Sequence, residues 1–200
     1  VLLQILSDAA KPKKNEMTGP LAVLAKMKAL AKGRIRGEAA KALATFDDPE
    51  LISILRECKK DDDGRVRDGA AVGLALLGDR SEVIVFCSAV TDPDQGIRLA
   101  AVEALGEVAD PKSASVLLKA LNDADESVRA MAAKGLGKTK SGEASDALSE
   151  FLTDSSGMVR ENSAWALGEI GAKDKVASLK ASLQDPNGIV QLAAAGALGK

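Results

Sequence analysis

The sequence predicts an all-α protein built from about six stacked helical hairpins. Three observations indicate this fold class. A motif recurs every 31 residues, apolar residues inside each repeat follow the spacing of one helix face, and the chain has three Phe, one Trp and no Tyr. A core so poor in aromatic side chains must be built from Ala, Leu, Val and Ile. That composition suits close helix packing better than a β-sandwich.

The repeat is defined by columns of equivalent residues that are each 31 positions apart. A β-branched residue stands near the start of the motif, at Ile35, Val66, Ile97, Val128, Val159 and Val190. A leucine stands near its end, at Leu43, Leu74, Leu105, Leu136, Leu167 and Leu198. Because several columns keep the same step over five or six copies, we interpret the chain as a repeat array.

Each repeat contains two apolar-periodic segments joined by a short turn. The first segment is typified by Lys112–Leu121 and the second by Val128–Leu136. Asp, Pro, Gly and Ser between them are cap and turn residues. We therefore expect a helical hairpin in every repeat, with second helices near residues 34–45, 65–77, 96–108, 127–138, 158–170 and 188–199.

Small residues occupy two further columns and predict how the hairpins stack. One of these columns reads Ala39, Ala70, Ala101, Ala132, Ser163 and Ala194. A single hairpin cannot bury its own apolar face, but a stack of hairpins can, and small side chains let neighbouring helices approach closely. Glycines near the end of the second segment either permit a close approach or help to end the helix; they are Gly106, Gly137, Gly168 and Gly199.

The motif V-R-x-x-A-A-x-A-L-G, preceded by a helix that ends near an Asp and a turn, resembles the HEAT-repeat family. The resemblance is to its short PBS-lyase-like subclass, and the best copies lie between Asp92 and Gly199. It implies a right-handed α-α superhelix, or solenoid, whose second helices line the concave side. The motif is specific for a fold and weak for a function.

The N-terminal segment departs from this pattern. Residues 20–200 follow the 31-residue period, whereas residues 1–19 form either an irregular repeat remnant or a segment that is not contiguous with the rest, because about nine residues are missing from the period. We expect the array to be part of a longer one, since neither end has an obvious polar capping repeat.

Composition excludes several classes of function. The chain has no His, which removes Ser-His-Asp and Cys-His catalysis and His-ligated metal sites. Its two cysteines, Cys58 and Cys87, are too few for a four-cysteine metal site or a disulfide framework, and we expect reduced structural thiols in a reducing compartment. No apolar run is long enough to span a membrane, so we expect a soluble protein. No cofactor and no metal ligand set is predicted.

Two columns of the repeat, one of Arg and one of Asp, predict a structural ladder of ion pairs. Each Arg opens a second helix near a turn that carries an Asp, and stacking brings an Asp close to an Arg of the same or the adjacent repeat. The Arg column is Arg36, Arg67, Arg98, Arg129 and Arg160, and it ends at Gln191. The Asp column is Asp61, Asp92, Asp123, Asp154 and Asp185.

The columns of the second helices that vary predict an exposed face for binding another protein. Positions four residues apart lie on one side of a helix. Charge sign alternates between repeats, which predicts ion pairs of small individual worth between repeats and argues against one continuous basic groove. Trp165 stands in one of these columns and is the strongest candidate contact, since Trp is enriched among interface hot spots. The remaining candidates are Glu161, Glu169, Lys134, Lys138, Glu103, Val72 and Leu99.

A basic patch is a second candidate surface. It comprises Lys26, Lys28, Lys32 and Arg34, within a region 1–60 that carries 12 Lys and Arg against 7 Asp and Glu. Residues 61–200 carry 15 against 22. No aromatic residue is interleaved for base stacking, so a solvated helix face is the simpler interpretation and an auxiliary nucleic-acid contact the alternative.

The leading functional hypothesis is a non-catalytic protein-binding scaffold or a subunit of a larger assembly. A lyase-like or other enzyme-accessory role is the alternative that the PBS-lyase-like resemblance implies, because those repeats are named for proteins that attach or detach bilins on phycobiliproteins. The deoxyhypusine hydroxylases, another enzyme type with HEAT repeats, use His and Glu as metal ligands. A chain without His cannot be one of them.

Overall fold

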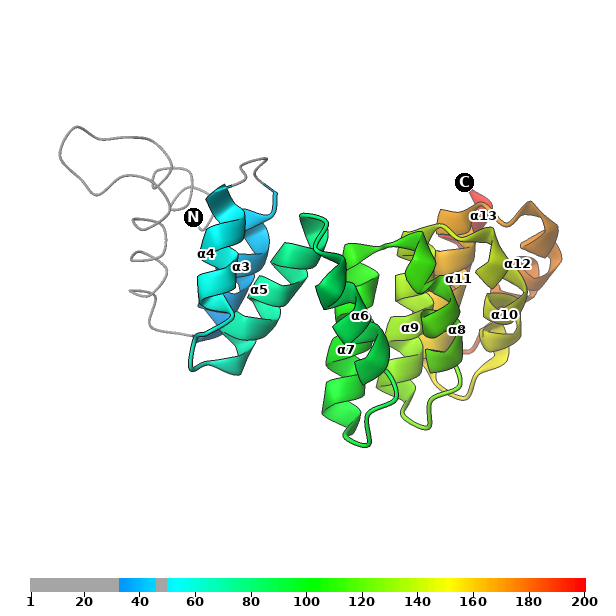
Figure 1. Cartoon of the computed structure of the whole chain (residues 1–200). Helices are drawn as coiled ribbons and strands as arrows, with labels where there is room; N and C mark the ends of the chain where they lie inside the picture. Colours follow the sequence, from blue (N-terminus) through cyan, green and yellow to red (C-terminus); the bar gives the residue numbers. More distant parts are fainter. Residues whose placement is uncertain (1–32, 46–49) are drawn as a thin grey trace. The chain divides into compact units, whose positions relative to one another are not determined.

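A computed structural model describes residues 33–45 and 50–200, with side chains for residues 37–45 and 51–200 (Figure 1). The regular structure in these ranges is helical. The chain divides into two compact units, Val1–Glu82 and Val83–Lys200, which are described one at a time below. The all-α, solenoid-type architecture that the repeats predict is confirmed.

The helix bounds follow the 31-residue period. In the first unit the helices are α3 (Gly33–Leu43), α4 (Glu50–Cys58) and α5 (Gly64–Leu76), and α6 (Arg80–Ala89) crosses the unit boundary. The second unit contains α7 (Gln95–Val108), α8 (Ala114–Ala120), α9 (Glu126–Thr139), α10 (Ser145–Glu150), α11 (Gly157–Ile170), α12 (Val176–Ser182) and α13 (Gly188–Leu198). Short 3-10 turns flank its first helices: η1 (Pro111–Ser113), η2 (Gly142–Ala144), η3 (Phe151–Thr153) and η4 (Lys173–Lys175). The second helices α3, α5, α7, α9, α11 and α13 begin and end within two residues of the predicted positions.

Capping residues explain where the second helices begin. The Asp94 carboxylate accepts hydrogen bonds from the backbone amides of Gly96 and Ile97 at the start of α7. Asp125 does the same at the start of α9, and Asp63 accepts from one amide at the start of α5. Each cap satisfies amide donors that have no partner inside the helix.

Left-handed residues explain where these helices end. Ala109 follows α7 with a φ of 52°, Lys140 follows α9 with 51°, and Gly171 follows α11 with 72°. A single residue in this region turns the chain out of the helix while its amide still bonds the last turn. The three glycines Gly106, Gly137 and Gly168 lie inside the helices, so they do not end them.

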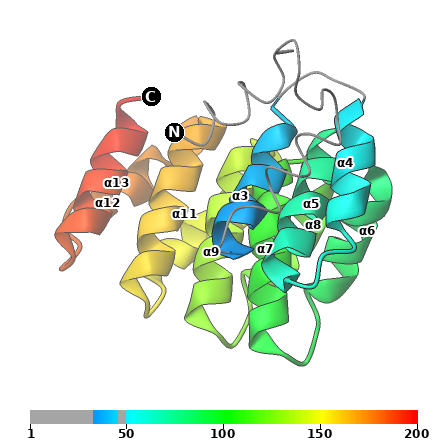
Figure 2. The ribbon, with the colours of Figure 1, turned by 90° about the vertical axis from the view of Figure 1, so that its left-hand side faces the viewer.

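Helices of the second unit form two layers. The second helices α7, α9, α11 and α13 pack side by side in chain order, and Figure 2 shows α9, α11 and α13 following one another. Each of the first helices α8, α10 and α12 packs against the second helix that follows it in the chain. This is the hairpin arrangement that the two segments of each repeat predict.

The core of the second unit lies between these layers. Leu105, Leu136 and Leu167 are completely buried there, as expected for the leucine column. The small column is buried as well, at Ala101, Ala132, Ser163 and Ala194. Burial of apolar surface, which contributes about 25 cal/mol per Å², drives the stacking. One hairpin alone buries too little of that surface.

Glycines set the distance between adjacent second helices. A Cβ on Gly106 would lie 3.0 Å from the Cα of Gly135 on the next helix. A Cβ on Gly137 or Gly168 would lie 2.8 and 2.7 Å from the Cα of Ala166 and Ala197. Because these neighbours are backbone atoms, they cannot give way as a flexible side chain would. Of the two roles that the sequence leaves open for these three glycines, the structure therefore supports close approach.

The first unit has its own core, which is built from the same columns. Ala39, Leu43, Val66, Ala70 and Leu74 are buried between α3, α5 and α4. A Cβ on Gly69 would collide with the carbonyl of Gly37, so α3 and α5 are also in close backbone contact. The Lys59 ammonium bonds both carboxylate oxygens of Glu82, at 2.8 and 2.7 Å.

Candidate interaction face

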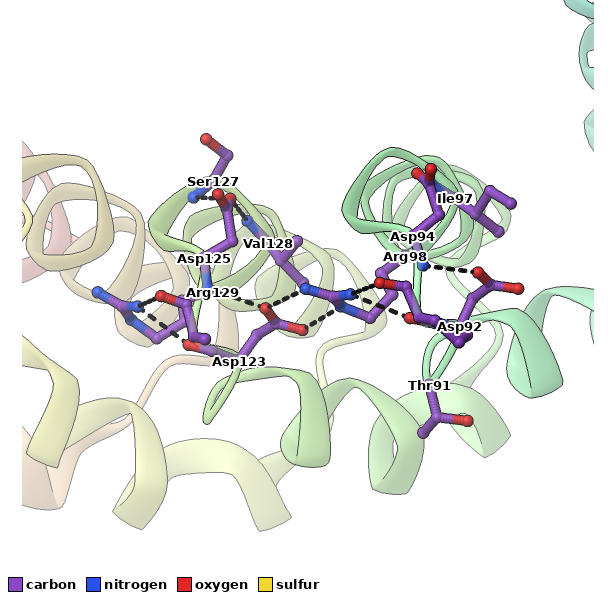
Figure 3. A network of polar contacts seen from close by, with 12 residues as sticks. Thr91, Asp92, Asp94, Ile97, Arg98, Asp123, Asp125, Ser127, Val128 and Arg129 are labelled. Atoms are coloured by element: carbon purple, nitrogen blue, oxygen red, sulfur yellow. Dashed lines mark hydrogen bonds and ion pairs between the residues drawn. The ribbon is translucent and has the colours of Figure 1, made fainter.

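The turn edge of the second unit comprises the loops between first and second helices, where the Arg and Asp columns lie. Arg98 donates from Nε to Oδ2 of Asp123 at 2.7 Å and from Nη2 to Oδ1 at 3.0 Å. Asp123 belongs to the next repeat, so this two-pronged ion pair joins adjacent hairpins (Figure 3). Parallel N–H···O bonds of this kind fix geometry as well as supplying energy.

Two further steps repeat this geometry. Arg129 bonds both oxygens of Asp154 at 3.0 Å, and Arg160 bonds those of Asp185 at 2.7 and 3.0 Å. In each of these arginines, the third guanidinium nitrogen donates to backbone carbonyls of the loop in its own repeat. Nη1 of Arg129, for example, donates to the carbonyls of Asp123 and Ala124 at 3.0 and 3.1 Å. Each Arg thus ties its own turn to the turn of the next repeat.

The aspartates of the turn edge are bonded from a second direction. Asp123 accepts a hydrogen bond from the backbone amide of Asp125, and Asp154 accepts one from Ser156. The hydrogen bond from Arg98 holds the pKa of Asp123 below its usual value. Burial alone would raise the pKa of Asp154, but the bonds from Arg129 and the Ser156 amide outweigh it and the pKa is lowered. The turn edge is therefore saturated with internal bonds and has a structural role.

The bond from the Arg position back to its own loop also occurs in two further repeats. Arg67 donates from Nη1 to the carbonyls of Asp61 and Asp62, at 2.8 and 2.9 Å. Gln191, at the Arg position of the last repeat, keeps the equivalent bond to the Asp185 carbonyl at 2.7 Å. Its neutral amide cannot supply the two-pronged pair. The side chain of Arg36 lies outside the described residues.

The second-helix face of this unit comprises three positions, four residues apart, on each second helix. Its members are Leu99, Glu103 and Glu107 on α7; Ala130, Lys134 and Lys138 on α9; Glu161, Trp165 and Glu169 on α11; and Leu192, Gly196 and Lys200 on or just after α13. Glu103, Lys134, Lys138 and Leu192 are exposed, and Glu161 and Trp165 are half-buried. The helices place these side chains in adjacent rows because α7, α9, α11 and α13 pack side by side.

Trp165 rests on the glycine of the neighbouring helix. A Cβ on Gly137 would lie 2.8 Å from Cζ3 of the indole, so the absence of a side chain on α9 creates the space for the ring. The ring also packs against the hydrophobic core while part of it stays accessible. The indole is thus held in place by packing and still presents apolar surface to solvent.

Four charged residues of the second-helix face have no partner among the described residues. Within the described residues, Glu103, Lys134, Lys138 and Glu161 make no hydrogen bond or ion pair. Glu169 differs, because its carboxylate pairs with the ammonium of Lys200. A narrow cavity of about 50 Å³ lies between α7 and α9, lined by Glu103, Gly106, Glu107, Met131, Lys134, Gly135 and Lys138.

The expectation that Val72 is an exposed contact residue is wrong. Its side chain on α5 is only 7% exposed. An isopropyl group gains free energy by leaving water, whereas the charged residues in the same column of other repeats must stay hydrated. Leu99 is half-buried and packs against the core of the second unit, so part of its side chain stays accessible.

The basic patch falls mostly outside the part of the chain that the structure describes. Lys26, Lys28 and Lys32 are not among the described residues, and only the backbone of Arg34 is. The predicted irregular segment 1–19 also lies outside them. A nucleic-acid contact at this patch stays a prediction.

The cysteines and carboxylates of the described ranges are the residues that bear on metal and thiol chemistry. No group of three or more Cys, Asp or Glu side chains there is arranged to hold a metal ion. Neither cysteine forms a disulfide: Cys58 is buried, and burial raises the pKa of the half-buried Cys87. Among the helices of residues 33–45 and 50–200, none is long and apolar enough to cross a membrane.

Solved structures with the same fold include natural and designed repeat proteins. The complex of CpcE and CpcF of phycocyanin lyase from Nostoc sp. is 24% identical, with a TM-score of 0.59 over 75% of this chain and 99% of that one. A designed armadillo repeat protein in complex with a (KR)4 peptide is 19% identical, with a TM-score of 0.56 over 99% and 98%. Human deoxyhypusine hydroxylase is 22% identical, with a TM-score of 0.51 over 90% and 72%. At these identities the likeness shows the fold alone.

A comparison with curated proteins gives no match. The family model for HEAT repeats matches residues 20–85, 60–127 and 114–199, which together span nearly the whole chain. The matched segments contain the helical hairpins, the buried small and leucine columns and the Arg–Asp turn edge described above. The chain therefore belongs to the HEAT-repeat family.

Proposed function

We propose that this chain is a non-catalytic scaffold that binds another protein through the second-helix face of the Val83–Lys200 unit. The observation that carries the proposal is a contrast between polar groups. Arg and Asp side chains of the turn edge bond one another, whereas Glu103, Lys134, Lys138 and Glu161 bond nothing within the described residues. Charges that do not hold the fold together are available to a partner.

Trp165 is the proposed apolar anchor of this interface. Its ring is fixed against Gly137 and the core, so little conformational freedom is lost when a partner covers it. Aromatic side chains surrounded by polar groups are typical hot spots, because the surrounding contacts exclude water from the anchor. The free charges on α7, α9 and α11 provide such a polar surrounding.

Proteins of similar fold support a binding role. The designed armadillo protein is in complex with a peptide, and CpcE is in complex with CpcF. These likenesses concern the repeat frame, and a shared frame does not transfer a catalytic activity. A sequence without His also lacks the residue that most acid–base catalysis uses.

Affinity purification of the native full-length protein at moderate salt, with and without nuclease, tests this proposal. Three forms are compared: the unsubstituted protein, Trp165→Ala and the control Lys180→Ala, which removes an exposed side chain on the first helix α12. We expect a stoichiometric protein partner that survives nuclease, is kept by Lys180→Ala and is lost at least about tenfold with Trp165→Ala. That loss corresponds to about 1.4 kcal/mol.

Two results would overturn the proposal. One is equal recovery of every partner by Trp165→Ala and by the unsubstituted protein. The other is recovery that disappears with nuclease, which would transfer the binding role to nucleic acid. Circular dichroism checks that Trp165→Ala remains helical, and Glu161→Lys, which changes a half-buried charge on the same helix, replaces it if it does not.

A further inference from the structure

The free charges of the second-helix face change sign from helix to helix. α7 presents the acidic Glu103, α9 presents the basic Lys134 and Lys138, and α11 presents the acidic Glu161. None of the four is neutralised by another described residue. A partner that crosses α7, α9 and α11 in turn therefore meets an acidic, then a basic, then an acidic surface.

On the second-helix face, α9 presents two charges without a described partner, whereas α7 and α11 present one each. Lys134 and Lys138 are four residues apart, so their ammonium groups lie on the same side of α9, and both are exposed. A carboxylate placed over α9 can pair with either ammonium. A cation placed there is repelled by both.

On the second-helix face, α11 carries both a carboxylate and an aromatic ring. Glu161 and Trp165 are also four residues apart on one side of the helix, and both are half-buried. A partner cation can pair with the carboxylate while lying over the accessible part of the indole, which attracts cations through its quadrupole. α11 is thus suited to a Lys or Arg side chain.

A small cavity on this face can take the end of one partner side chain. The cavity between α7 and α9 is about 50 Å³, because Gly106 and Gly135 bring the two helices into near contact. A space of this size takes the end of one side chain.

Helix spacing sets the spacing of the partner charges. Packed helices lie about 8–10 Å apart. A polyproline II segment rises about 3.1 Å per residue with three residues per turn, so every third side chain points the same way after about 9 Å. Charges three residues apart in such a segment would therefore meet α7, α9 and α11 in succession.

We propose that the second-helix face selects an extended protein segment in which a basic, an acidic and a basic residue follow one another at three-residue intervals. This inference rests on the proposed binding function and adds to it the chemistry of the partner. The order is symmetric, so the segment satisfies the face in either chain direction. Charge order gives specificity here, because a wrong order places like charges together.

Three peptides without aromatic residues test the inference. The first is Lys-Pro-Pro-Glu-Pro-Pro-Lys, the second is its permutation Glu-Pro-Pro-Lys-Pro-Pro-Lys, and the third is Lys-Pro-Pro-Lys-Pro-Pro-Lys. The intrinsic fluorescence of Trp165 reports binding directly, because the chain has one Trp and no Tyr. At low salt we expect the first peptide to bind about tenfold more tightly than either of the others, and the difference to shrink as salt screens the charges.

Charge reversal on α9 makes the test specific. The double substitution Lys134→Glu with Lys138→Glu should invert the preference, so that the all-lysine peptide binds more tightly than the first peptide. The control Lys180→Glu makes the same kind of charge change on α12, at an exposed residue away from the face, and should leave the preference unchanged. A merely structural role of the two lysines would not produce such an inversion.

The inference is overturned if the first two peptides bind equally, if neither binds, or if the double substitution keeps the original preference. Failure of the proposed function has a different signature, namely partner capture that does not depend on Trp165. A partner that depends on Trp165, together with no preference among the peptides, rejects the charge order and leaves the scaffold function standing.

Discussion

The turn edge and the second-helix face of the Val83–Lys200 unit are made from the same helices and differ in how their charges are used. At the turn edge, Arg98, Arg129 and Arg160 are each 14–17% exposed and bond both oxygens of an Asp in the next repeat. On the second-helix face, Lys134 and Lys138 are exposed and bond no described residue. One set of charges connects repeats, and the other is open to solvent.

This difference shows how a repeat protein separates stability from recognition. Positions that must meet an equivalent position in the next repeat keep the same residue type, since a change there breaks a bond between hairpins. On the second-helix face Glu169 pairs with Lys200, but Lys134 and Lys138 bond no described residue, so their residue type can vary with little loss of stability. The predictions below test this separation, beginning with the largest expected effect.

Removing one carboxylate from the turn edge should have the largest effect. Asp154→Ala leaves the guanidinium of Arg129 without its two-pronged partner and removes the bond to the Ser156 amide. We expect a loss of about 2–4 kcal/mol in the free energy of unfolding, measured by urea melts followed by circular dichroism. The control is Asp146→Ala, because Asp146 is 88% exposed and pairs with Lys175 on the surface. That pair should contribute less than about 1 kcal/mol, and equal losses in the two variants would contradict the structural role of the turn edge.

Adding one methyl group between adjacent second helices should have the next largest effect. In Gly137→Ala the new Cβ would lie 2.8 Å from the Cα of Ala166 and from Cζ3 of Trp165. We expect a loss of about 1–3 kcal/mol from overpacking and a shifted Trp165 emission, because the ring must move. The matched control is Gly142→Ala, where nothing lies within 4 Å of the added Cβ. An unchanged urea midpoint for Gly137→Ala would mean that the helices do not approach as closely as described.

Acid should weaken the turn edge as its aspartates become protonated. The hydrogen bonds from Arg98 and Arg160 lower the pKa of Asp123 and Asp185, and the pKa of Asp154 is lowered as well. A carboxylate whose pKa is lower in the folded state stabilises the fold fully above its unfolded pKa of about 3.9. That stabilisation is lost as the pH falls through the folded pKa.

The corresponding measurement is the urea midpoint as a function of pH. We expect little contribution from these three aspartates to any change between pH 7 and about 5, and a steep fall below about pH 4. Asp154→Ala, which has already lost one of the three groups, should show a shallower fall over the same range. An acid limb of identical steepness in both proteins would show that Asp154 does not titrate with folding.

Reversing a charge on the second-helix face should have the smallest effect on stability. Lys134 is exposed and bonds no described residue, so Lys134→Glu should change the free energy of unfolding by less than about 0.5 kcal/mol. The same substitution should weaken binding of the Lys-Pro-Pro-Glu-Pro-Pro-Lys peptide, measured by Trp165 fluorescence. A large loss of stability would place Lys134 among the structural charges and remove the contrast between the two regions.

Much of the fold can be predicted from the sequence, because the same helix pattern recurs in every repeat. One weak helix pattern would leave its ends uncertain, but six aligned copies locate the second helices to within two residues. Burial of Leu105, Leu136 and Leu167 follows from the same columns. Trp165 stands in a variable column, for which we expect partial exposure, and its side chain is half-buried.

The contacts of the candidate site are harder to predict, because they depend on which repeat supplies each neighbouring residue. The columns leave open whether an Asp pairs with an Arg of the same or the adjacent repeat, and the pairs that form are those with the following repeat. Val72 shares a column with charged residues, yet it is buried, since column membership does not report hydration. The alternating charges predict ion pairs between repeats on the second-helix face, and Glu169 does pair with Lys200, whereas Lys134 and Lys138 bond no described residue.

The sequence by itself determined the helical hairpins, their period and the residues that form the core, because each of these follows from spacing along one chain. Only the tertiary structure decided which charges are bonded and which are free. The cations of both regions carry the same charge and lie on second helices; they are Arg98, Arg129 and Arg160 and the two lysines of α9. Their different roles arise because helix packing brings an Asp to each guanidinium and brings no carboxylate of the described residues to either ammonium.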